Sequence, residues 1–233
     1  MLTEFIKEPF LGFDQNSVDF LGKLKNKKFN NKKWFDKNRE TYELHVKLPM
    51  RHLIDSLAQE LKNIDERIFI SNKSIMRINR DIRFKKDKIP YKTVYAAAFT
   101  YDRLKSPEIP LFYIHLSSDE FLFAAGQYST DNGIIKKIRN HIFNYFDDFL
   151  SIVTDDDLIR DFGSLNGESL QRLPREYSGL TLDGEMEKYL KMKQFYVEKY
   201  FSPDIAFDPG LTDLIVQCVR STNKLNKFLY DSL

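Results

Sequence analysis

Residues 73–92 hold the side chains best suited to chemistry, with eight basic residues and only two acidic ones. Arg77, Arg80 and Arg83 follow one another closely there, with Asp81 among them. The planar fork of a guanidinium matches the oxygens of a phosphate or carboxylate, and each charged hydrogen bond of this kind contributes ~1.5–3 kcal/mol. Because Asp81 can neutralise only one arginine, at least one other needs an acid from elsewhere or an anionic ligand.

Three interpretations of this arginine cluster remain open on the sequence alone. The cluster can be an anion-binding site, or a network of arginines and carboxylates that braces a sheet against helices. It can also be a solvated edge strand, whose charges discourage pairing with another chain. Exposed ion pairs contribute only ~0.2–1 kcal/mol, whereas a half-buried guanidinium without a partner is costly. The burial of each arginine and its ion-pair partners therefore decide between the three interpretations.

The element that must position these arginines is predicted to be a β-strand. Successive side chains of a strand point to opposite faces. One face would carry the polar residues Arg77, Asn79, Asp81 and Arg83. The opposite face would carry the apolar residues Met76, Ile78, Ile82 and Phe84, with Arg80 as the polar exception. The pattern therefore predicts a polar floor on an apolar support.

Hydrophobic periodicity predicts helices on either side of a central run of strands. The expected helices are residues 15–29, 31–48, 49–61, 131–152, 155–162 and 183–193, with a last helix from about Thr212. The expected strands are residues 67–84, 94–101, 109–117, 120–127 and 195–200. This order favours an α+β fold in a single domain over residues 1–233. We expect a central, mainly antiparallel sheet of four to six strands, covered by N-terminal and C-terminal helices.

Composition and charge limit the class of protein. Hydrophobic residues make up 42% and charged residues 30%, which is typical of a globular chain. The one cysteine, Cys218, excludes an intrachain disulfide framework, and the four histidines lack the spacing of a zinc site. We expect no metal and no cofactor. The N-terminus does not resemble a signal peptide and no apolar run is long enough to span a membrane, so we expect a cytoplasmic protein with no membrane partner.

Basic residues are concentrated in the N-terminal half. Residues 1–105 hold 23 Lys and Arg against 14 Asp and Glu, while the rest of the chain is acidic. The two halves can complement each other in the fold, or the basic half can face an anionic partner such as nucleic acid. The lysine run at residues 23–28 is most simply a solvated helix face, since it lacks the interleaved aromatic residues of single-strand binders.

Three motifs carry a family resemblance. The central motif is Arg77-x-x-Arg80-Asp81-x-Arg83-Phe84 with Asp87-Lys88-x-Pro90-Tyr91-Lys92-Thr93. The others are Asn31-x-x-Trp34-Phe35-x-x-Asn38-Arg39-x-x-Tyr42 and the segment Gly167-Glu168-Ser169-Leu170-Gln171-Arg172-Leu173-Pro174-Arg175. Together they resemble a mainly bacterial family catalogued as domain of unknown function 2461. The chain departs from the family pattern at Lys32, Gln171 and Glu176, and Gln171 weakens any role of that position in anion binding. The resemblance implies a single domain and supplies no activity.

These motifs suggest one composite ligand site. Its floor would hold Arg77, Arg80, Asp81 and Arg83, and the adjoining loop would add Lys88, Tyr91 and Lys92. Its walls would come from Arg39 with Trp34 or Tyr42, and from the loop that carries Arg172 and Arg175. Core packing is the simpler interpretation of the aromatic residues.

Two side chains are candidates for proton transfer, which leaves open whether the protein is an enzyme. Asp81 lies within the arginine cluster, and His115 would be a general base if its side of the sheet is also that of Arg77. A hydrogen-bonded structural histidine is the alternative for His115. The best prediction is a protein that binds a phosphorylated or carboxylated ligand in an arginine-rich pocket. The alternatives are a nucleic-acid-binding module that uses the basic N-terminal half, and a structural or interaction protein with internally paired arginines.

Overall fold

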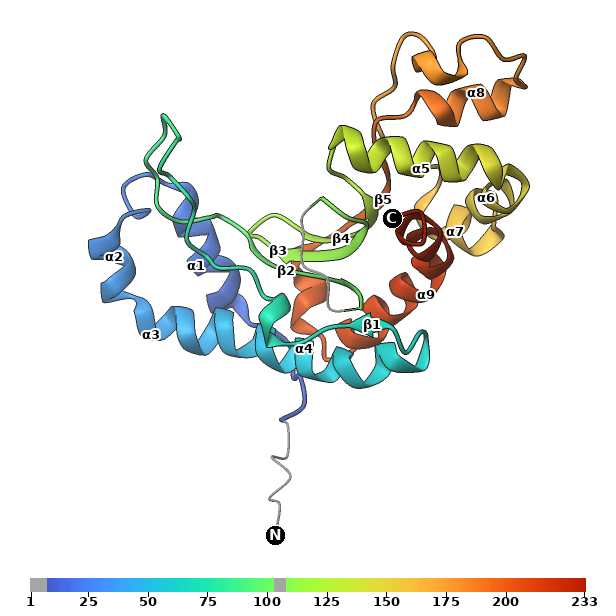
Figure 1. Cartoon of the computed structure of the whole chain (residues 1–233). Helices are drawn as coiled ribbons and strands as arrows, with labels where there is room; N and C mark the ends of the chain where they lie inside the picture. The colour runs from blue at the N-terminus through green and yellow to red at the C-terminus, as the bar shows by residue number, and fades with distance from the viewer. Residues whose placement is uncertain (1–7, 103–107) are drawn as a thin grey trace. The chain divides into compact units, whose positions relative to one another are not determined.

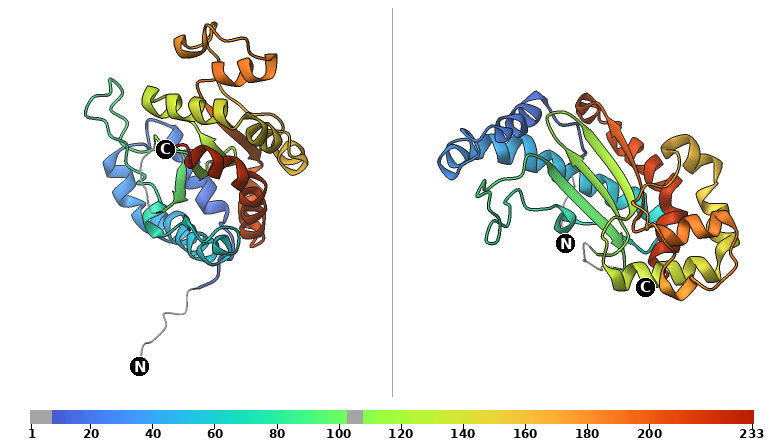
Figure 2. Two further views of the ribbon diagram at one scale, coloured as in Figure 1. Left: turned by 45° about the vertical axis from the view of Figure 1, so that its right-hand side comes forward. Right: turned by 90° about the horizontal axis from the view of Figure 1, so that it is seen from above.

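Five strands in chain order form one antiparallel sheet in the computed structural model, which describes residues 8–102 and 108–233 (Figure 1). They are β1 (Ile68–Phe69), β2 (Tyr95–Tyr101), β3 (Leu111–Leu116), β4 (Phe121–Gln127) and β5 (Phe195–Phe201). Figure 2 shows the central strands side by side. Helices precede and follow the central strands along the chain, so the predicted α+β class is confirmed.

A tight turn joins β3 to β4 and closes a hairpin. The N–H of Ser117 donates to the carbonyl of Glu120 at 2.9 Å. The Ser117 hydroxyl oxygen accepts from the N–H groups of Asp119 and Glu120, both at 3.1 Å. The serine side chain thus satisfies backbone donors of the turn, which is the role that serine often has in such positions.

Backbone proximity divides the chain into two compact units. The first holds Met1–Phe99, Tyr113–Phe123 and Tyr200–Gln217, and the second holds Thr100–Phe112, Ala124–Lys199 and Cys218–Leu233. Strands β2 to β5 therefore each contribute residues to both units. The single-domain prediction stays a prediction.

The first unit is built on a long helical run, which is defined as residues 32–60. Its helices are α1 (Gln15–Lys25), α2 (Lys32–Lys37), α3 (Arg39–Thr41) and α4 (Leu48–Glu60), with a π-helical turn, η1 (Tyr42–Lys47), joining α3 to α4. Short 3-10 turns follow at η2 (Leu61–Asn63), η3 (Asn72–Ser74) and η5 (Pro203–Phe207). Apolar residues at helical spacing fill its core, among them the fully buried Leu21, Met50, Leu53 and Leu57.

The second unit contains α5 (Asn132–Asn144), α6 (Phe146–Val153), α7 (Asp156–Phe162), η4 (Arg175–Tyr177), α8 (Gly184–Lys191) and most of α9 (Leu211–Tyr230). The helix predicted over 131–152 is interrupted at Tyr145, whose φ of −130° and ψ of 48° are not helical. Its core includes the buried Ile138, Phe149, Phe195 and Leu225. Cys218 is a free, buried thiol in α9.

The strand predicted over residues 67–84 is wrong. Only β1 is a strand there, and residues 75–97, called the arm below, form a loose hairpin with isolated bridges from Ile75 to Ala97 and from Asn79 to Tyr91. Phe84, expected on an apolar face, is 92% exposed. The physical reason is the density of charge at the end of the arm, because burying Phe84 would also remove its cationic neighbours from water.

None of the helices described here is long and apolar enough to cross a membrane.

Candidate anion-binding cleft

A cleft of about 330 Å³ lies in the first unit, between the helical run and the start of the arm. Four cationic side chains line it: Arg39, Lys47, Arg51 and Arg77. Glu43 is the one acidic residue among the lining residues. The cleft is therefore cationic, and it joins two of the predicted site residues, Arg39 and Arg77, with two that the sequence interpretation missed.

The missed cations belong to a regular pattern along the helical run. Residues 39, 43, 47 and 51 recur every four positions, so their side chains lie near one face of the helix. This spacing was the available signal for Lys47 and Arg51. The π-helical turn η1 carries Glu43 and Lys47, and π-bulges are frequent at functional sites.

Two of the four cations have carboxylate partners. Arg39 pairs with Asp36 at 2.6 Å, and Lys47 pairs with Glu43 at 2.6 Å. Arg51 and Arg77 form no ion pair within residues 8–102 and 108–233. The cleft thus contains two exposed guanidinium groups that form no ion pair in the described part of the chain.

Two tyrosine hydroxyls meet in the wall of the cleft. The hydroxyl of Tyr42 donates to that of Tyr95 at 3.3 Å. Burial is the main cause that raises the pKa of both tyrosines, while the charge of Arg51 opposes this effect. Both hydroxyls therefore keep their protons at neutral pH, and Tyr95 can donate its own proton to a ligand.

The other arginines of the cluster are paired within the arm. Arg80 contacts Asp87 at 2.9 Å and donates to the carbonyl of Ile89 at 3.2 Å. Arg83 donates two hydrogen bonds to the carboxylate of Asp81, from Nε to Oδ1 at 3.0 Å and from Nη2 to Oδ2 at 2.7 Å. These contacts hold the pKa values of Asp81 and Asp87 below their ordinary range, in each case mainly through the arginine hydrogen bond. None of these four residues lines the cleft as the structure describes it.

The remaining predicted site residues have structural surroundings. Tyr91 is buried and stacks on Phe35 with 4.1 Å between ring centroids, and Trp34 packs against Phe20 at 5.3 Å. Lys88 donates to the carbonyl of Ile82 at 3.0 Å and closes the turn of the arm.

Lys92 and Arg175 complete the predicted set. Lys92 is half-buried, and its pKa is lowered first by burial and then by the charge of Arg77. The positive charge of Arg77, which lines the cleft, thus disfavours the protonated form of Lys92. Arg175 is an exposed residue of η4 in the second unit, and Arg172 is exposed in the preceding loop.

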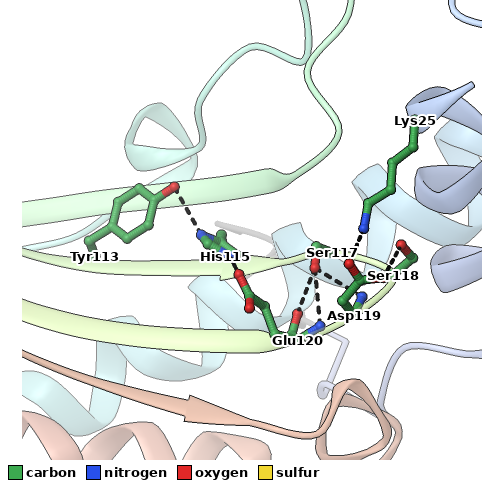
Figure 3. Close-up of polar contacts among 7 residues, drawn as sticks. All are labelled: Lys25, Tyr113, His115, Ser117, Ser118, Asp119 and Glu120. Atoms are coloured by element: carbon green, nitrogen blue, oxygen red, sulfur yellow. Dashed lines mark hydrogen bonds and ion pairs between the residues drawn. The ribbon is translucent and has the colours of Figure 1, made fainter. Parts of the chain in front are cut away.

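The buried His115, the weaker catalytic candidate, is part of a hydrogen-bonded chain (Figure 3). Its Nε2 lies 3.1 Å from Glu120 Oε1, and its Nδ1 lies 3.2 Å from the Tyr113 hydroxyl. Burial lowers the pKa of His115 despite the opposing effect of Glu120, and burial raises the pKa of Tyr113 to about 12. These contacts match the structural alternative, and His115 is not among the residues that line the cleft.

Comparison with known proteins supports the predicted resemblance. A family model described as a conserved hypothetical protein, DUF2461, matches residues 16–228. The chain belongs to this family. The match covers the helical run, the arm and the loop that carries Arg175, so all three motifs lie inside it. No functionally curated protein matches the chain.

The donor set of the cleft suits anions rather than cations. Within the described residues no group of three or more His, Cys, Asp and Glu side chains is placed to hold a metal ion. Guanidinium, ammonium and phenol groups donate hydrogen bonds, and negative oxygens are their best acceptors.

Proposed function

We propose that this protein binds a small anionic ligand, phosphorylated or carboxylated, in the cleft between the helical run and the arm. The observation that carries the proposal is the pair Arg51 and Arg77, which line the cleft and form no ion pair in the described part of the chain. An anion placed between them would balance both charges. A bidentate contact to each guanidinium would also fix the orientation of the ligand.

The size and the lining of the cleft limit the ligand. A volume of about 330 Å³ is at the low end of the ~300–1,000 Å³ typical of small-molecule sites. Phe35, Met76 and Ile78 add apolar surface, and Asn72 and Asn79 add neutral polar groups. These features favour a compact molecule with an acidic head and a short organic part.

The tyrosine pair supplies a neutral donor beside the cations. Because Tyr42 donates to Tyr95, the Tyr95 oxygen is already an acceptor and its hydrogen can point toward the ligand. A neutral hydrogen bond of this kind contributes ~0.5–1.5 kcal/mol. Tyr95→Phe should therefore weaken anion binding by roughly 2- to 10-fold.

The structural alternative explains only part of the arginine cluster. Internal pairing accounts for Arg39, Arg80 and Arg83. It does not account for Arg51 and Arg77. We assign no catalytic role, since Asp81 is an exposed carboxylate tied to Arg83 and His115 is tied to Glu120.

Thermal unfolding in the presence of inorganic phosphate, sulfate or citrate tests the proposal. A ligand at 100 times its Kd stabilises the folded state by ~2.7 kcal/mol. For a chain of this size that corresponds to a rise in Tm of roughly 5–10 °C. Arg51→Ala and Arg77→Ala should each abolish most of this rise. Arg77→Lys, which keeps the charge but loses the planar fork, should retain only part of it.

Arg220→Ala is the matched control, because Arg220 is exposed on α9 in the second unit and the same charge is lost. Phosphate and sulfate also stabilise proteins in general by exclusion from their surface. If the wild type, the two cleft variants and Arg220→Ala show equal rises, this general effect is sufficient and the proposed site is refuted.

A further inference from the structure

We propose that the end of the arm, together with the turn after α1, forms a second surface that binds single-stranded nucleic acid. In this surface a base stacks on Phe84 while lysines contact the phosphates. The surface is separate from the cleft and uses none of its lining residues, so either proposal can fail without the other. The tip, defined as residues 81–88, holds four basic and two acidic side chains.

The exposed ring of Phe84 is the first observation. Its side chain is among the large apolar groups that the protein leaves in water, at 92% exposure. The guanidinium of Arg83 lies over the ring, 5.8 Å from its centroid. Asp81 holds that guanidinium through two hydrogen bonds. A cation on one side of the ring leaves the other side open to a base, and each base stacked on an aromatic side chain contributes ~1–3 kcal/mol.

The turn that presents Phe84 is held by polar contacts. Lys88 donates to the carbonyl of Ile82 at 3.0 Å, and Arg80 bridges to Asp87 at 2.9 Å. The N–H of Arg80 also donates to the carbonyl of Pro90 at 2.8 Å. These cations serve the architecture of the tip, and a turn held in this way loses less entropy when a ligand binds.

Lys85 and Lys86 remain available for phosphates. Both residues directly follow Phe84 in the chain, and both are exposed. Neither side chain forms a hydrogen bond or an ion pair in the described part of the chain. Their ammonium groups are strongly hydrated point charges, which suits sequence-independent contact with a phosphate backbone.

The turn after α1, residues 26–31, contacts the arm, because the side-chain amide of Asn30 donates to the carbonyl of Tyr91 and accepts from its N–H, both at 3.0 Å. The pKa of Asp87 is lowered mainly by its hydrogen bonds from Arg80 and Ile89, and the charge of Lys27 adds to this effect. Lys27 is an exposed residue of this turn. The ammonium group of Lys28 lies 5.7 Å from the ring centroid of Phe29. This contact is of the same kind as that of Arg83 with Phe84. The lysine run lacked stacking residues in the sequence, and the arm supplies one in the fold.

The chemistry of the tip favours a single strand over the alternatives. Bases of a duplex are stacked inside the helix, whereas unpaired bases can reach an exposed ring. A loop that inserts into a membrane needs a larger apolar surface, but at this tip only Phe84 is a fully exposed large apolar side chain, since Ile82 is half-buried.

Fluorescence anisotropy of the full chain with a labelled oligothymidylate of about 12 nucleotides tests the proposal. Phe84→Leu should weaken binding by about 5- to 100-fold without changing its salt dependence, and Phe84→Tyr should restore it. Lys85→Gln with Lys86→Gln should lower the slope of log K against log salt by about 1.4, which corresponds to two phosphates. An abasic oligomer of equal charge should bind the wild type and Phe84→Leu equally.

Lys136→Gln with Lys137→Gln is the matched control, because these adjacent exposed lysines of α5 lose the same charge in the second unit. An equal loss of binding in this control would overturn the proposal in favour of diffuse electrostatics. Binding to phosphatidylserine vesicles with no binding to the oligomer would overturn it in favour of a membrane surface. No binding of the oligomer at low salt would also overturn it. None of these variants touches the cleft, so the phosphate test of Arg51 and Arg77 is independent.

Discussion

The hydroxyl of Ser17 donates a 2.5 Å hydrogen bond to the backbone carbonyl of His45. In a regular α-helix that carbonyl would accept from the residue four positions later, which here is Pro49 and has no N–H. The buried Ser17 thus joins α1 to the π-helical turn η1 at the point where proline removes a donor. One wall of the basic cleft depends on this contact, because η1 carries Glu43 and Lys47.

Ser17→Ala should lower the free energy of unfolding by ~1–3 kcal/mol, because it removes the buried hydroxyl that donates to the part-buried carbonyl of His45. The same change removes one half of the capping box at the start of α1, where Ser17 and Asp14 bond each other. Urea unfolding measures the effect. Ser178→Ala removes an exposed hydroxyl that donates to Arg175 at 3.0 Å and should change stability by less than ~0.5 kcal/mol. Equal effects of the two substitutions would contradict the role given to Ser17.

The buried His115 should make stability depend on pH. Its pKa in the folded state lies below the ordinary value of 6.5, mainly because of burial. The unfolded chain therefore binds a proton more readily, so the contribution is complete above the unfolded pKa and is lost as the pH falls toward the folded pKa. His115→Gln should lose less stability than the wild type between about pH 7.5 and about pH 5.5.

Urea unfolding at the two pH values measures this difference. His52→Gln is the control, since His52 lies within ion-pair reach of the exposed Glu8 and outside the chain formed by His115, Glu120 and Tyr113. Parallel losses in the wild type and His115→Gln would show that His115 is not the source.

Gly126 of β4 should not tolerate a side chain. Its φ is +122°, and an added Cβ would lie 2.2 Å from the carbonyl oxygen of Phe195 in β5. Gly126→Ala should therefore cost roughly 1–3 kcal/mol or more, through overpacking as well as an unfavourable backbone conformation. Gly179→Ala is the matched control in the same unit, because no atom lies within 4 Å of the added Cβ. Thermal unfolding should separate the two variants clearly, and similar Tm values would contradict the close approach of β4 and β5.

Local pattern was sufficient for most of the sheet and for several helices. The strands predicted over 94–101, 109–117 and 120–127 correspond to β2, β3 and β4, because alternation and turn residues are properties of short segments. The helix predicted over 155–162 corresponds to α7 and is capped by Asp155, whose side chain accepts from the N–H of Asp157. Capping depends on neighbouring residues alone and can be recognised without the fold.

The cleft could be predicted only in part, because ion-pair partners are chosen by the fold. Asp81 was expected to pair with one arginine, and it takes Arg83, two residues away. Arg77 is the arginine of this cluster that forms no ion pair in the described residues. The sequence does not identify it, because the fold decides that Arg80 pairs with Asp87 and that the helical run lies beside the arm. The alternation of polar and apolar residues wrongly predicted a strand over residues 67–84. Such an alternation forms a strand only where the apolar face is buried against a core, and Phe84 is exposed to water.

Arg77→Ala should leave stability without added anion unchanged within ~0.5 kcal/mol, or raise it, because Arg77 is exposed and forms no ion pair in the described residues. It should also raise the pKa of Lys92 toward its ordinary value of 10.5, although burial, the larger cause, remains. An NMR titration of the lysine side chains measures the second effect. Arg80→Ala, which breaks the pair with Asp87, should cost up to ~1 kcal/mol. If urea unfolding shows Arg77→Ala to be the more damaging of the two, Arg77 stabilises the fold itself, and the unbalanced charge on which anion binding depends does not exist.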